Sequence, residues 1–369
     1  MAENGPFAAT EGSGTADTAP PGPVESSGST VPPAGGGSPA PESGGADAKK
    51  TGNVSGARTE NVTADPTRTI VCTGHSRPIP QIEFMNTEND GLFLISACLD
   101  NRPMLRNGVT GDWIGSFVGH NGAVWCARLN SNATRAITAS ADYTAKYWDA
   151  ITGKVRHTFE HEHIVRAAAF SNSNNYVFTA GHEGKIRMFD LHKPDSAPMM
   201  CESHGSKLQY ILTPKAENTI ISSDDKGQDL CVWDTRTMKA VKTLHAGGVV
   251  TDLCPALDNS LICATAGNSV FFWDMETYEL KKSFTMERKL MSVAVDAKRG
   301  RFVLGSHGEL WVRRYDFQTG KEVACTKGHH GPVGSLAFTP SGKYASGSVD
   351  GTIRICHWET NENEVKEAK

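Results

Sequence analysis

The chain has 369 residues, a formal net charge of −4 and a charged fraction of 21%. Its length suits one large domain or two ordinary ones, and its near-neutral balance excludes both a nucleic-acid-binding polycation and a protein dominated by an acidic tail. The nine cysteines form no C-x-x-C pair, which indicates reduced thiols in a cytosolic or nuclear compartment, and the sequence shows no secretory signal and no apolar run of ~18 residues that would span a membrane.

Residues 1–67 are rich in Ala, Gly, Pro, Ser and Thr, and they carry three basic residues against eight acidic ones. Such a segment buries too little apolar surface to offset the entropy lost on ordering. We therefore expect a disordered tail over 1–67, one domain over 68–359 and a short charged tail over 360–369.

From Thr69 onward, short β-rich runs alternate with turn residues, and two dipeptides recur among them. Gly-His stands at 74–75, 119–120 and 328–329, and Trp-Asp stands at 148–149, 233–234 and 273–274. Degenerate copies are expected at His161, His204 and His245 for the first dipeptide, and at Phe189-Asp190, Tyr315-Asp316 and His357-Trp358 for the second. Successive histidines from the first Gly-His to His245 lie 41 to 45 residues apart. This period is typical of a WD-repeat blade and predicts an all-β fold, a single seven-bladed β-propeller.

The two clearest blades allow strands to be predicted in detail. Blade two is expected to have strands at 123–129, 135–140, 145–148 and 154–159. Blade seven is expected to have strands at 333–338, 344–348 and 353–358, after which the chain is too short for a fourth. An open sheet would leave unpaired edges. We therefore predict that residues 69–72 supply the missing outer strand and close the ring.

His120, Ser140 and Asp142 have the residue types of a hydrolase triad. The same set recurs in blade seven and in part in blade one, however, and a nucleophile is needed once whereas a structural network is needed in every blade. We predict a brace in which the imidazole bonds the turn Asp, the strand Ser and the later indole, so that no donor is buried unpaired. The expected brace residues are His75, Asp100, His120, Ser140, Asp142, Trp148, His329, Ser348 and Asp350.

Other chemistry finds little support in the sequence. His161-Glu162-His163 lacks further ligands at metal-site spacing, and no phosphate-binding loop follows a strand and opens a helix. We expect no catalytic residue, no metal and no cofactor.

Blade six is unusually basic. Between Lys281 and Arg314 it carries nine basic residues against three acidic ones. These charges could be solvated on different faces, or they could form a patch that attracts an acidic partner or RNA phosphates. Lys298, Arg299 and Arg301 are the candidates for the second interpretation.

Four further residues are candidates for partner binding. Trp125 falls out of step with its buried neighbours in the strand, so we expect it to face the channel or the upper surface. Trp113 either binds a partner or seals blade one, since exposed aromatic residues and arginines make up many interface hot spots. Arg77 and Arg106 lie in the same stretch of the sequence.

A resemblance narrows the WD-repeat assignment. The stretches that carry it are Arg77-Pro78, Pro103-Met104-Leu105-Arg106, Thr110-Gly111-Asp112-Trp113-Ile114-Gly115 and Gly122-Ala123-Val124-Trp125. Over residues 69–359 the chain resembles the family of serine-threonine kinase receptor-associated proteins, also called unr-interacting proteins. The likeness is specific at 72–165 and general to WD repeats further on. Family members usually begin close to the first blade and carry an acidic C-terminal extension, and this chain departs from both features.

The resemblance implies a non-enzymatic cytoplasmic and nuclear adaptor. Its expected partners are proteins: the survival-of-motor-neuron complex with its Gemin-type subunits, which loads Sm proteins onto spliceosomal RNAs, the transforming-growth-factor-β receptor, whose signalling it dampens, and a cold-shock-domain RNA-binding protein. Contact with RNA is expected to be indirect or weak. The alternatives are a scaffold like subunit i of translation initiation factor 3, and a propeller that contacts RNA through basic blade six.

Overall fold

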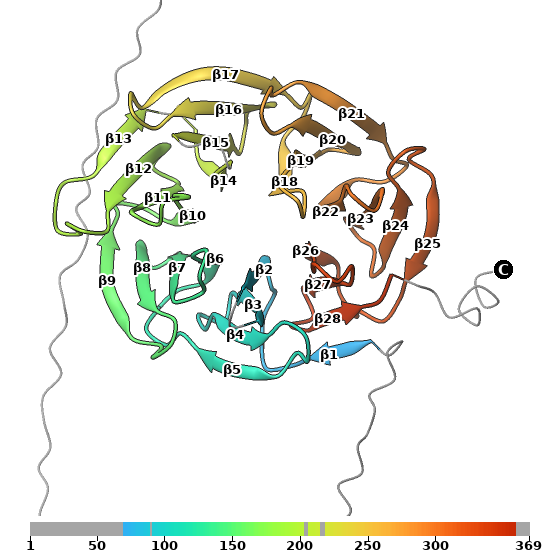
Figure 1. Ribbon diagram of the computed structural model, residues 1–369, viewed down its shortest axis with the longest axis horizontal. Helices are drawn as coiled ribbons and strands as arrows, with labels where there is room; N and C mark the ends of the chain where they lie inside the picture. The colour runs from blue at the N-terminus through green and yellow to red at the C-terminus, as the bar shows by residue number, and fades with distance from the viewer. Residues whose placement is uncertain (1–68, 89–90, 203–205, 215–217, 359–369) are drawn as a thin grey trace, which may run out of the picture. The chain divides into compact units, whose positions relative to one another are not determined.

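The computed structural model describes residues 69–88, 91–202, 206–214 and 218–358, so the expected tails at 1–67 and 360–369 lie outside the described residues. The described chain forms seven four-stranded antiparallel sheets, arranged as blades around a central channel (Figure 1). This confirms the predicted seven-bladed propeller. None of the described elements is a helix, so none could cross a membrane as a long apolar helix.

The strands follow the blades in chain order, with the first strand of each blade innermost. Blades one to three are β2 (Gln81–Thr87), β3 (Gly91–Ala97), β4 (Met104–Asn107) and β5 (Trp113–Ser116); β6 (Val124–Leu129), β7 (Arg135–Ser140), β8 (Thr144–Asp149) and β9 (Val155–Glu160); β10 (Val165–Phe170), β11 (Tyr176–Gly181), β12 (Lys185–Asp190) and β13 (Met199–Glu202). Blades four to six are β14 (Leu208–Leu212), β15 (Thr219–Asp224), β16 (Asp229–Asp234) and β17 (Lys239–His245); β18 (Val250–Pro255), β19 (Leu261–Ala266), β20 (Ser269–Asp274) and β21 (Leu280–Thr285); β22 (Leu290–Asp296), β23 (Arg301–Ser306), β24 (Val312–Asp316) and β25 (Glu322–Thr326). Blade seven consists of β26 (Val333–Phe338), β27 (Tyr344–Ser348), β28 (Ile353–Cys356) and β1 (Ile70–Cys72).

The ring closes as predicted. Strand β1 pairs with β28 in antiparallel register, with Ile70 opposite Ile355 and Cys72 opposite Ile353. The first described strand therefore becomes the outer edge of the last blade, and Figure 1 shows the two ends of the ring meeting there. The closure covers the edge of β28 and buries Cys72 against blade seven.

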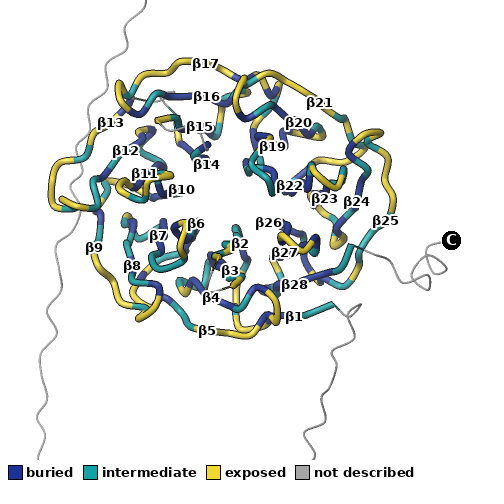
Figure 2. Tube along the Cα trace, in the orientation of Figure 1, coloured by how far each residue is buried: buried dark blue, intermediate teal, exposed yellow. Residues whose placement is uncertain are grey.

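Packing between blades explains the apolar runs in the sequence. The second strands of blades two to seven are almost entirely buried, as in β19, whereas outer strands such as β17 and β21 are largely exposed (Figure 2). A strand covered on both faces by neighbouring blades needs no polar alternation. The core clusters accordingly combine blades: Ile95 and Phe117 of blade one pack with Val124 and Trp148 of blade two.

The innermost strands share an irregularity that matters for function. In blades two to seven the pairing between the first and second strands shifts by one residue near its start. The extra residues are Trp125, Arg166, Gln209, Thr251, Met291 and Gly334. A β-bulge of this kind re-aims the side chain of the extra residue. This accounts for the irregular position of Trp125 relative to the buried residues around it.

Candidate functional site

The brace of blade two is a continuous chain of hydrogen bonds. His120 Nδ1 lies 2.7 Å from Asp142 Oδ2, and His120 Nε2 lies 2.6 Å from Thr138 Oγ1. Trp148 Nε1 donates to the same hydroxyl at 2.8 Å. The carboxylate favours the tautomer with the proton on Nδ1. Nε2 therefore accepts from Thr138, whose oxygen in turn accepts from the buried indole.

One brace residue was assigned wrongly from sequence. Ser140 was expected to bond the imidazole, but the structure places Thr138 in that role. The Ser140 hydroxyl instead donates to the Gly122 carbonyl at 3.1 Å and accepts from the Asp142 backbone amide at 3.2 Å. Residues two apart in a strand point to the same side. Residue type and side-chain direction therefore could not show whether Thr138 or Ser140 bonds the imidazole. The answer depends on how far along the strand the His120 ring reaches.

Blade seven has the same histidine–aspartate–hydroxyl contacts, and again the hydroxyl residue two positions before the expected serine bonds the imidazole. His329 Nδ1 lies 3.0 Å from Asp350, and its Nε2 lies 2.7 Å from Ser346 rather than from Ser348. The Ser348 hydroxyl bonds the Gly331 carbonyl at 2.9 Å. Burial lowers the pKa of His329 despite the hydrogen bond to Asp350, so the ring is neutral at physiological pH. The serine expected in the triad position is thus not in contact with the imidazole.

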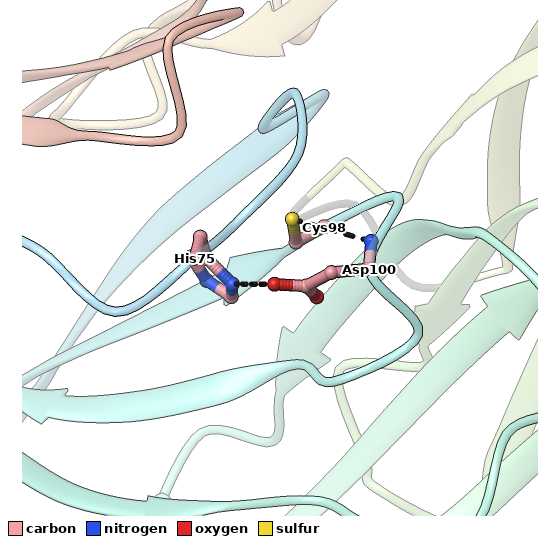
Figure 3. Close-up of side chains that lie close together, drawn as sticks. All are labelled: His75, Cys98 and Asp100. Atoms are coloured by element: carbon pink, nitrogen blue, oxygen red, sulfur yellow. Dashed lines mark hydrogen bonds and ion pairs between the residues drawn. The ribbon is translucent and has the colours of Figure 1, made fainter.

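Blade one brings together three side chains of metal-ligand type. Ligand atoms of His75, Cys98 and Asp100 lie within 4.8 Å of one another (Figure 3). Both ring nitrogens of His75 are already engaged, Nδ1 with Asp100 at 3.0 Å and Nε2 with Ser96 at 2.8 Å. The Cys98 thiol donates to the Arg77 carbonyl at 3.1 Å, and burial raises its pKa to about 12, which disfavours the thiolate that a metal requires. The cluster is the brace of blade one, with Cys98 in the place of Ser140.

The brace is altered in blade three. His161 Nε2 still bonds Thr179 at 2.8 Å, and its Nδ1 lies 3.1 Å from the Phe159 carbonyl. Glu183, which stands where other blades have Asp, pairs with Arg187 at 2.5 Å. Burial and the charge of Arg187 lower the pKa of His161 to about 4. This histidine is therefore structural and uncharged.

Two degenerate Gly-His positions have different outcomes. His204 lies outside the described residues. His245 was expected in the brace position, but it ends β17 on the surface, where its Nδ1 lies 3.0 Å from Asp229. Ala246, which is buried, stands four residues before the first residue of β18, as His120 does before β6. Blade five thus has no brace histidine.

The position of Trp148 is filled differently in blade one. Trp148 pairs with Ala136 across β7 and β8, and the equivalent pair in blade one is Arg106 with Leu94. Arg106 is only 5% exposed, and its guanidinium donates to the carbonyls of Gly111 and Thr73. The prediction that Arg106 binds a partner is therefore wrong, because the side chain is buried and both terminal nitrogens of its guanidinium donate to backbone carbonyls.

In blade seven the large and the small residue of this cross-strand pair change places. His357-Trp358 was expected at the Trp-Asp position, but Cys356 occupies it, opposite Tyr344. The large fully buried Tyr344 replaces a small alanine, while a small cysteine replaces the tryptophan. The two paired side chains together fill a similar volume, but the large one now lies on the second strand and the small one on the third. Trp358 instead packs beneath Arg301, whose guanidinium lies 4.8 Å from the ring centre.

Two candidates in blade six are engaged within the ring. Arg299 and Arg301 both contact Asp296, at 2.9 and 3.1 Å. Each also donates to a backbone carbonyl in blade seven, Arg299 to Pro340 at 3.1 Å and Arg301 to Gly342 at 2.7 Å. Their first role is therefore to join blades six and seven.

The other charges of blade six lie elsewhere. Arg288 and Arg313 share Glu309, each at 2.9 Å, and Arg313 also pairs with Glu322 at 2.8 Å. This group lies at the start of β22, whereas exposed Lys298 follows its end, roughly 20 Å away at ~3.3 Å per residue. The structure therefore spreads the basic side chains over different faces and does not gather them into one patch for RNA.

The remaining candidates are on the surface. Trp113 is 61% exposed, with its indole bonded to Ser116 at 3.1 Å, so it does not seal blade one. Ile114 and Val118 are exposed beside it in the sequence, at 48% and 67%. Arg77 is also exposed, in the loop that leads to the innermost strand. These residues remain available for contact with a partner.

Trp125 lies in the central channel, in contact with a residue that sequence reasoning missed. The guanidinium of Arg166 stacks on the Trp125 ring, 3.7 Å from its centre. Both line a cavity of about 60 Å³ formed by the innermost strands of blades one to five. The available signal was the repeat itself, since Arg166 follows Trp125 by 41 residues, one blade later.

Comparison with known proteins agrees with the geometry. Residues 111–149, 153–190 and 320–357 match the family model "WD domain, G-beta repeat". The chain is 41% identical over 287 residues to the serine-threonine kinase receptor-associated protein of Dictyostelium discoideum, covering 78% of this chain and 97% of that protein. Its human counterpart is 39% identical over 292 residues, covering 79% and 82%. Eukaryotic translation initiation factor 3 subunit I of Culex quinquefasciatus is 31% identical over 318 residues, covering 78% and 96%.

Proposed function

Because the chain belongs to the serine-threonine kinase receptor-associated protein family of WD-repeat proteins, we propose that it is a non-enzymatic adaptor of the survival-of-motor-neuron complex. In this role it assists assembly of the Sm core on spliceosomal RNAs. The observation that carries the proposal is the 41% identity over 97% of the Dictyostelium protein. The 287 aligned residues extend well beyond the three repeats that match the family model.

The chemistry of the ring supports a scaffold rather than an enzyme. The histidine-aspartate pairs of blades one, two and seven are used in the same way, as links in a hydrogen-bond chain. None of these imidazoles contacts the serine expected as a nucleophile. Exposed Trp113 and the Trp125–Arg166 pair in the channel supply surfaces that could hold proteins.

The proposed partners follow from the family. They are the survival-of-motor-neuron and Gemin-type proteins, a serine-threonine kinase receptor of the transforming-growth-factor-β type, and a cold-shock-domain RNA-binding protein. The name of these relatives, serine-threonine kinase receptor-associated protein, supports the receptor association. The protein would act in the cytoplasm and the nucleus and would reach RNA through these partners.

Affinity purification of the tagged full chain, followed by mass spectrometry, tests the proposal. We expect survival-of-motor-neuron and Gemin-type proteins to be recovered above the level seen with an unrelated propeller that carries the same tag. Extract depleted of the protein should assemble Sm cores more slowly, and adding the protein back should restore the rate. Unchanged assembly after complete depletion would contradict the proposal.

A scaffold of translation initiation factor 3 is the second candidate, favoured by the 31% identity to its subunit I over 96% of that protein. The same purification separates the two functions. Recovery of initiation-factor subunits in amounts equal to that of the tagged protein, without Gemin-type proteins, would favour this candidate over the first.

A further inference from the structure

One position of the innermost strand recurs around the mouth of the channel. In blades two to seven it is the bulged residue, and in blade one the register of Gln81 with Ala97 places Pro80 there. The seven side chains are Pro80, Trp125, Arg166, Gln209, Thr251, Met291 and Gly334. Only one of them is charged and only one is aromatic, and these two stand in neighbouring blades (Figure 1) and stack on each other.

The cavity beside this pair is lined by hydrogen-bond donors that lack acceptors. Trp125 Nε1, Arg128 Nε and Arg166 Nε are all buried, and none has an acceptor among the described residues. All three residues line the same cavity of about 60 Å³. A buried donor without an acceptor is unfavourable, because it has given up its hydrogen bonds to water and gained none in return. Three of them around one small space indicate that an acceptor group belongs there.

The geometry of the stack favours a carboxylate as that acceptor. Arg166 rests one face on the Trp125 ring, which leaves the in-plane N–H groups at its edge free to bond a carboxylate in a bidentate manner. The protein itself supplies no such partner. Asp252, the acid in the cavity wall, has its oxygens engaged by the backbone amides of Leu253 and Val293, each at 2.9 Å. Burial lowers the pKa of Arg166, as expected for a guanidinium without a counter-ion.

A row of aromatic side chains lies in the turns and loops of blades two and three. The rings of Tyr143 and His163 lie 5.5 Å apart, and those of His163 and His182 lie 5.2 Å apart. The backbone amide of His182 donates to the carbonyl of Ile164 at 2.9 Å, so the row ends beside the strand that carries Arg166, two residues from it in the sequence. A row of rings that ends at an unpaired guanidinium suits an extended polypeptide. Two carboxylates, Asp252 in the wall of this cavity and Glu83 in the adjoining one, disfavour a polyanion that continues along the channel more than they disfavour a single acidic side chain.

We propose that the Trp125–Arg166 recess binds an aspartate or glutamate side chain of a partner polypeptide. Arg166 is the counter-ion for that carboxylate, and the indole N–H of Trp125 is a second donor. The row Tyr143, His163 and His182 supports the peptide on its way into the channel. This site rests on the proposed scaffold function and names the chemistry of one partner segment.

A random dodecapeptide display library selected on the full chain is the probe. Selected peptides should be enriched in Asp or Glu, and the strongest should be measured by fluorescence anisotropy. Arg166→Gln should weaken its binding about ten- to hundred-fold, the range expected for losing a charged hydrogen bond. Replacing the acidic residue of the peptide by its amide should weaken binding equally. Combining both changes should add little, because they remove the same contact.

Control variants separate binding from folding. Arg236→Gln makes the same charge change at an exposed site in the turn after β16 and should bind like the wild type. Arg166→Lys keeps the charge without the planar fork and should give intermediate affinity, which keeps the test valid if Arg166→Gln unfolds. Selected peptides without acidic residues, or wild-type affinity in Arg166→Gln, would overturn the proposal. So would a single-stranded RNA that binds more tightly than any peptide in an Arg166-dependent way.

The outcome is distinguishable from failure of the proposed function. If the tagged wild type recovers no survival-of-motor-neuron proteins, that function fails, and an acidic peptide whose binding depends on Arg166 still supports the site. If the wild type and Arg166→Gln recover the complex equally and the library yields no acidic peptide, the site fails and the function stands.

Discussion

Thr138 is the residue on which the brace of blade two depends most. Its hydroxyl is completely buried and lies between His120 Nε2 at 2.6 Å and Trp148 Nε1 at 2.8 Å. Thr138→Val keeps the shape and the β-branched preference of the strand but removes that hydroxyl. The indole N–H and the imidazole nitrogen then face a methyl group, and both remain out of reach of water.

The expected cost follows from those two orphaned groups. A buried polar group without a partner costs about 1–3 kcal/mol, so Thr138→Val, which leaves two such groups, should lower the free energy of unfolding by about 2–6 kcal/mol. In a domain of this size that corresponds to a fall in Tm of roughly 4–24 °C. Ser140→Ala should cost less, about 1–3 kcal/mol, because the two groups that lose their partner, the Gly122 carbonyl and the Asp142 amide, lie in a part-buried position.

Urea unfolding followed by both tryptophan fluorescence and circular dichroism measures the difference. Coincidence of the two transitions shows whether a single free energy applies. Thr285→Val, on the exposed outer strand β21, is the matched control and should change stability by no more than about 0.5 kcal/mol. If Thr138→Val stays within that same margin, or is milder than Ser140→Ala, the hydrogen-bond chain is not what stabilises the blade. A hydrolytic activity lost in Ser140→Ala at unchanged stability would contradict the structural role of that serine.

Three further predictions concern pH, ring closure and blade six. Folding lowers the pKa of His161 from its ordinary 6.5 to about 4, so on acidification the unfolded chain binds a proton before the folded protein does. The contribution of His161 to the free energy of unfolding should be complete above pH ~6.5 and should fall by up to about 3 kcal/mol by pH ~4. His161→Gln should flatten the dependence of stability on pH over that window. Deleting residues 1–72 removes β1 and exposes the edge of β28, so this variant should melt lower and aggregate more than one that lacks only 1–67; equal melting of the two would show that β1 does not close the ring. Reversing Lys298, Arg299 and Arg301 to Glu should lower Tm, because two of them join blades six and seven, whereas Lys298→Glu alone should leave both Tm and filter binding of RNA unchanged; a salt-dependent loss of RNA binding in Lys298→Glu would restore the idea of an RNA site.

The frame of the molecule was predictable because the repeat is a property of spacing. Strands at 135–140, 333–338 and 344–348 match β7, β26 and β27 residue for residue, and most of the others differ by one or two residues. The closing strand followed from counting the edges of the last sheet. The spacing could not show which residue along a strand contacts the brace histidine. Thr138 and Ser140 point to the same side of the strand, so only the structure shows which of them the imidazole reaches.

Compensation between neighbouring strands also escaped sequence reasoning. Tyr344 and Cys356 together fill the space that Ala136 and Trp148 fill in blade two, but neither substitution is meaningful without its partner. Arg106 likewise has the residue type of an interface hot spot, and only the structure shows that it is buried and that its terminal nitrogens bond backbone carbonyls. Residues that depart from the repeat pattern are therefore taken as functional too often when each is considered without the residue that it pairs with.

Among the described residues, the brace histidine and the hydroxyl that it bonds occur together in blades one, two, three and seven. Blade five has Ala246 at the histidine position, and Ala264 stands where Thr138 stands in blade two. Blade six lacks the histidine as well, and Leu304 replaces the hydroxyl while Phe302 and Tyr315 stack with ring centres 5.0 Å apart. A buried network with one member missing is less stable than an apolar core, because the remaining groups stay desolvated and unpaired. Substituting the histidine alone therefore costs more than substituting the whole set, and this explains why the hydroxyl and the imidazole disappear together in blades five and six.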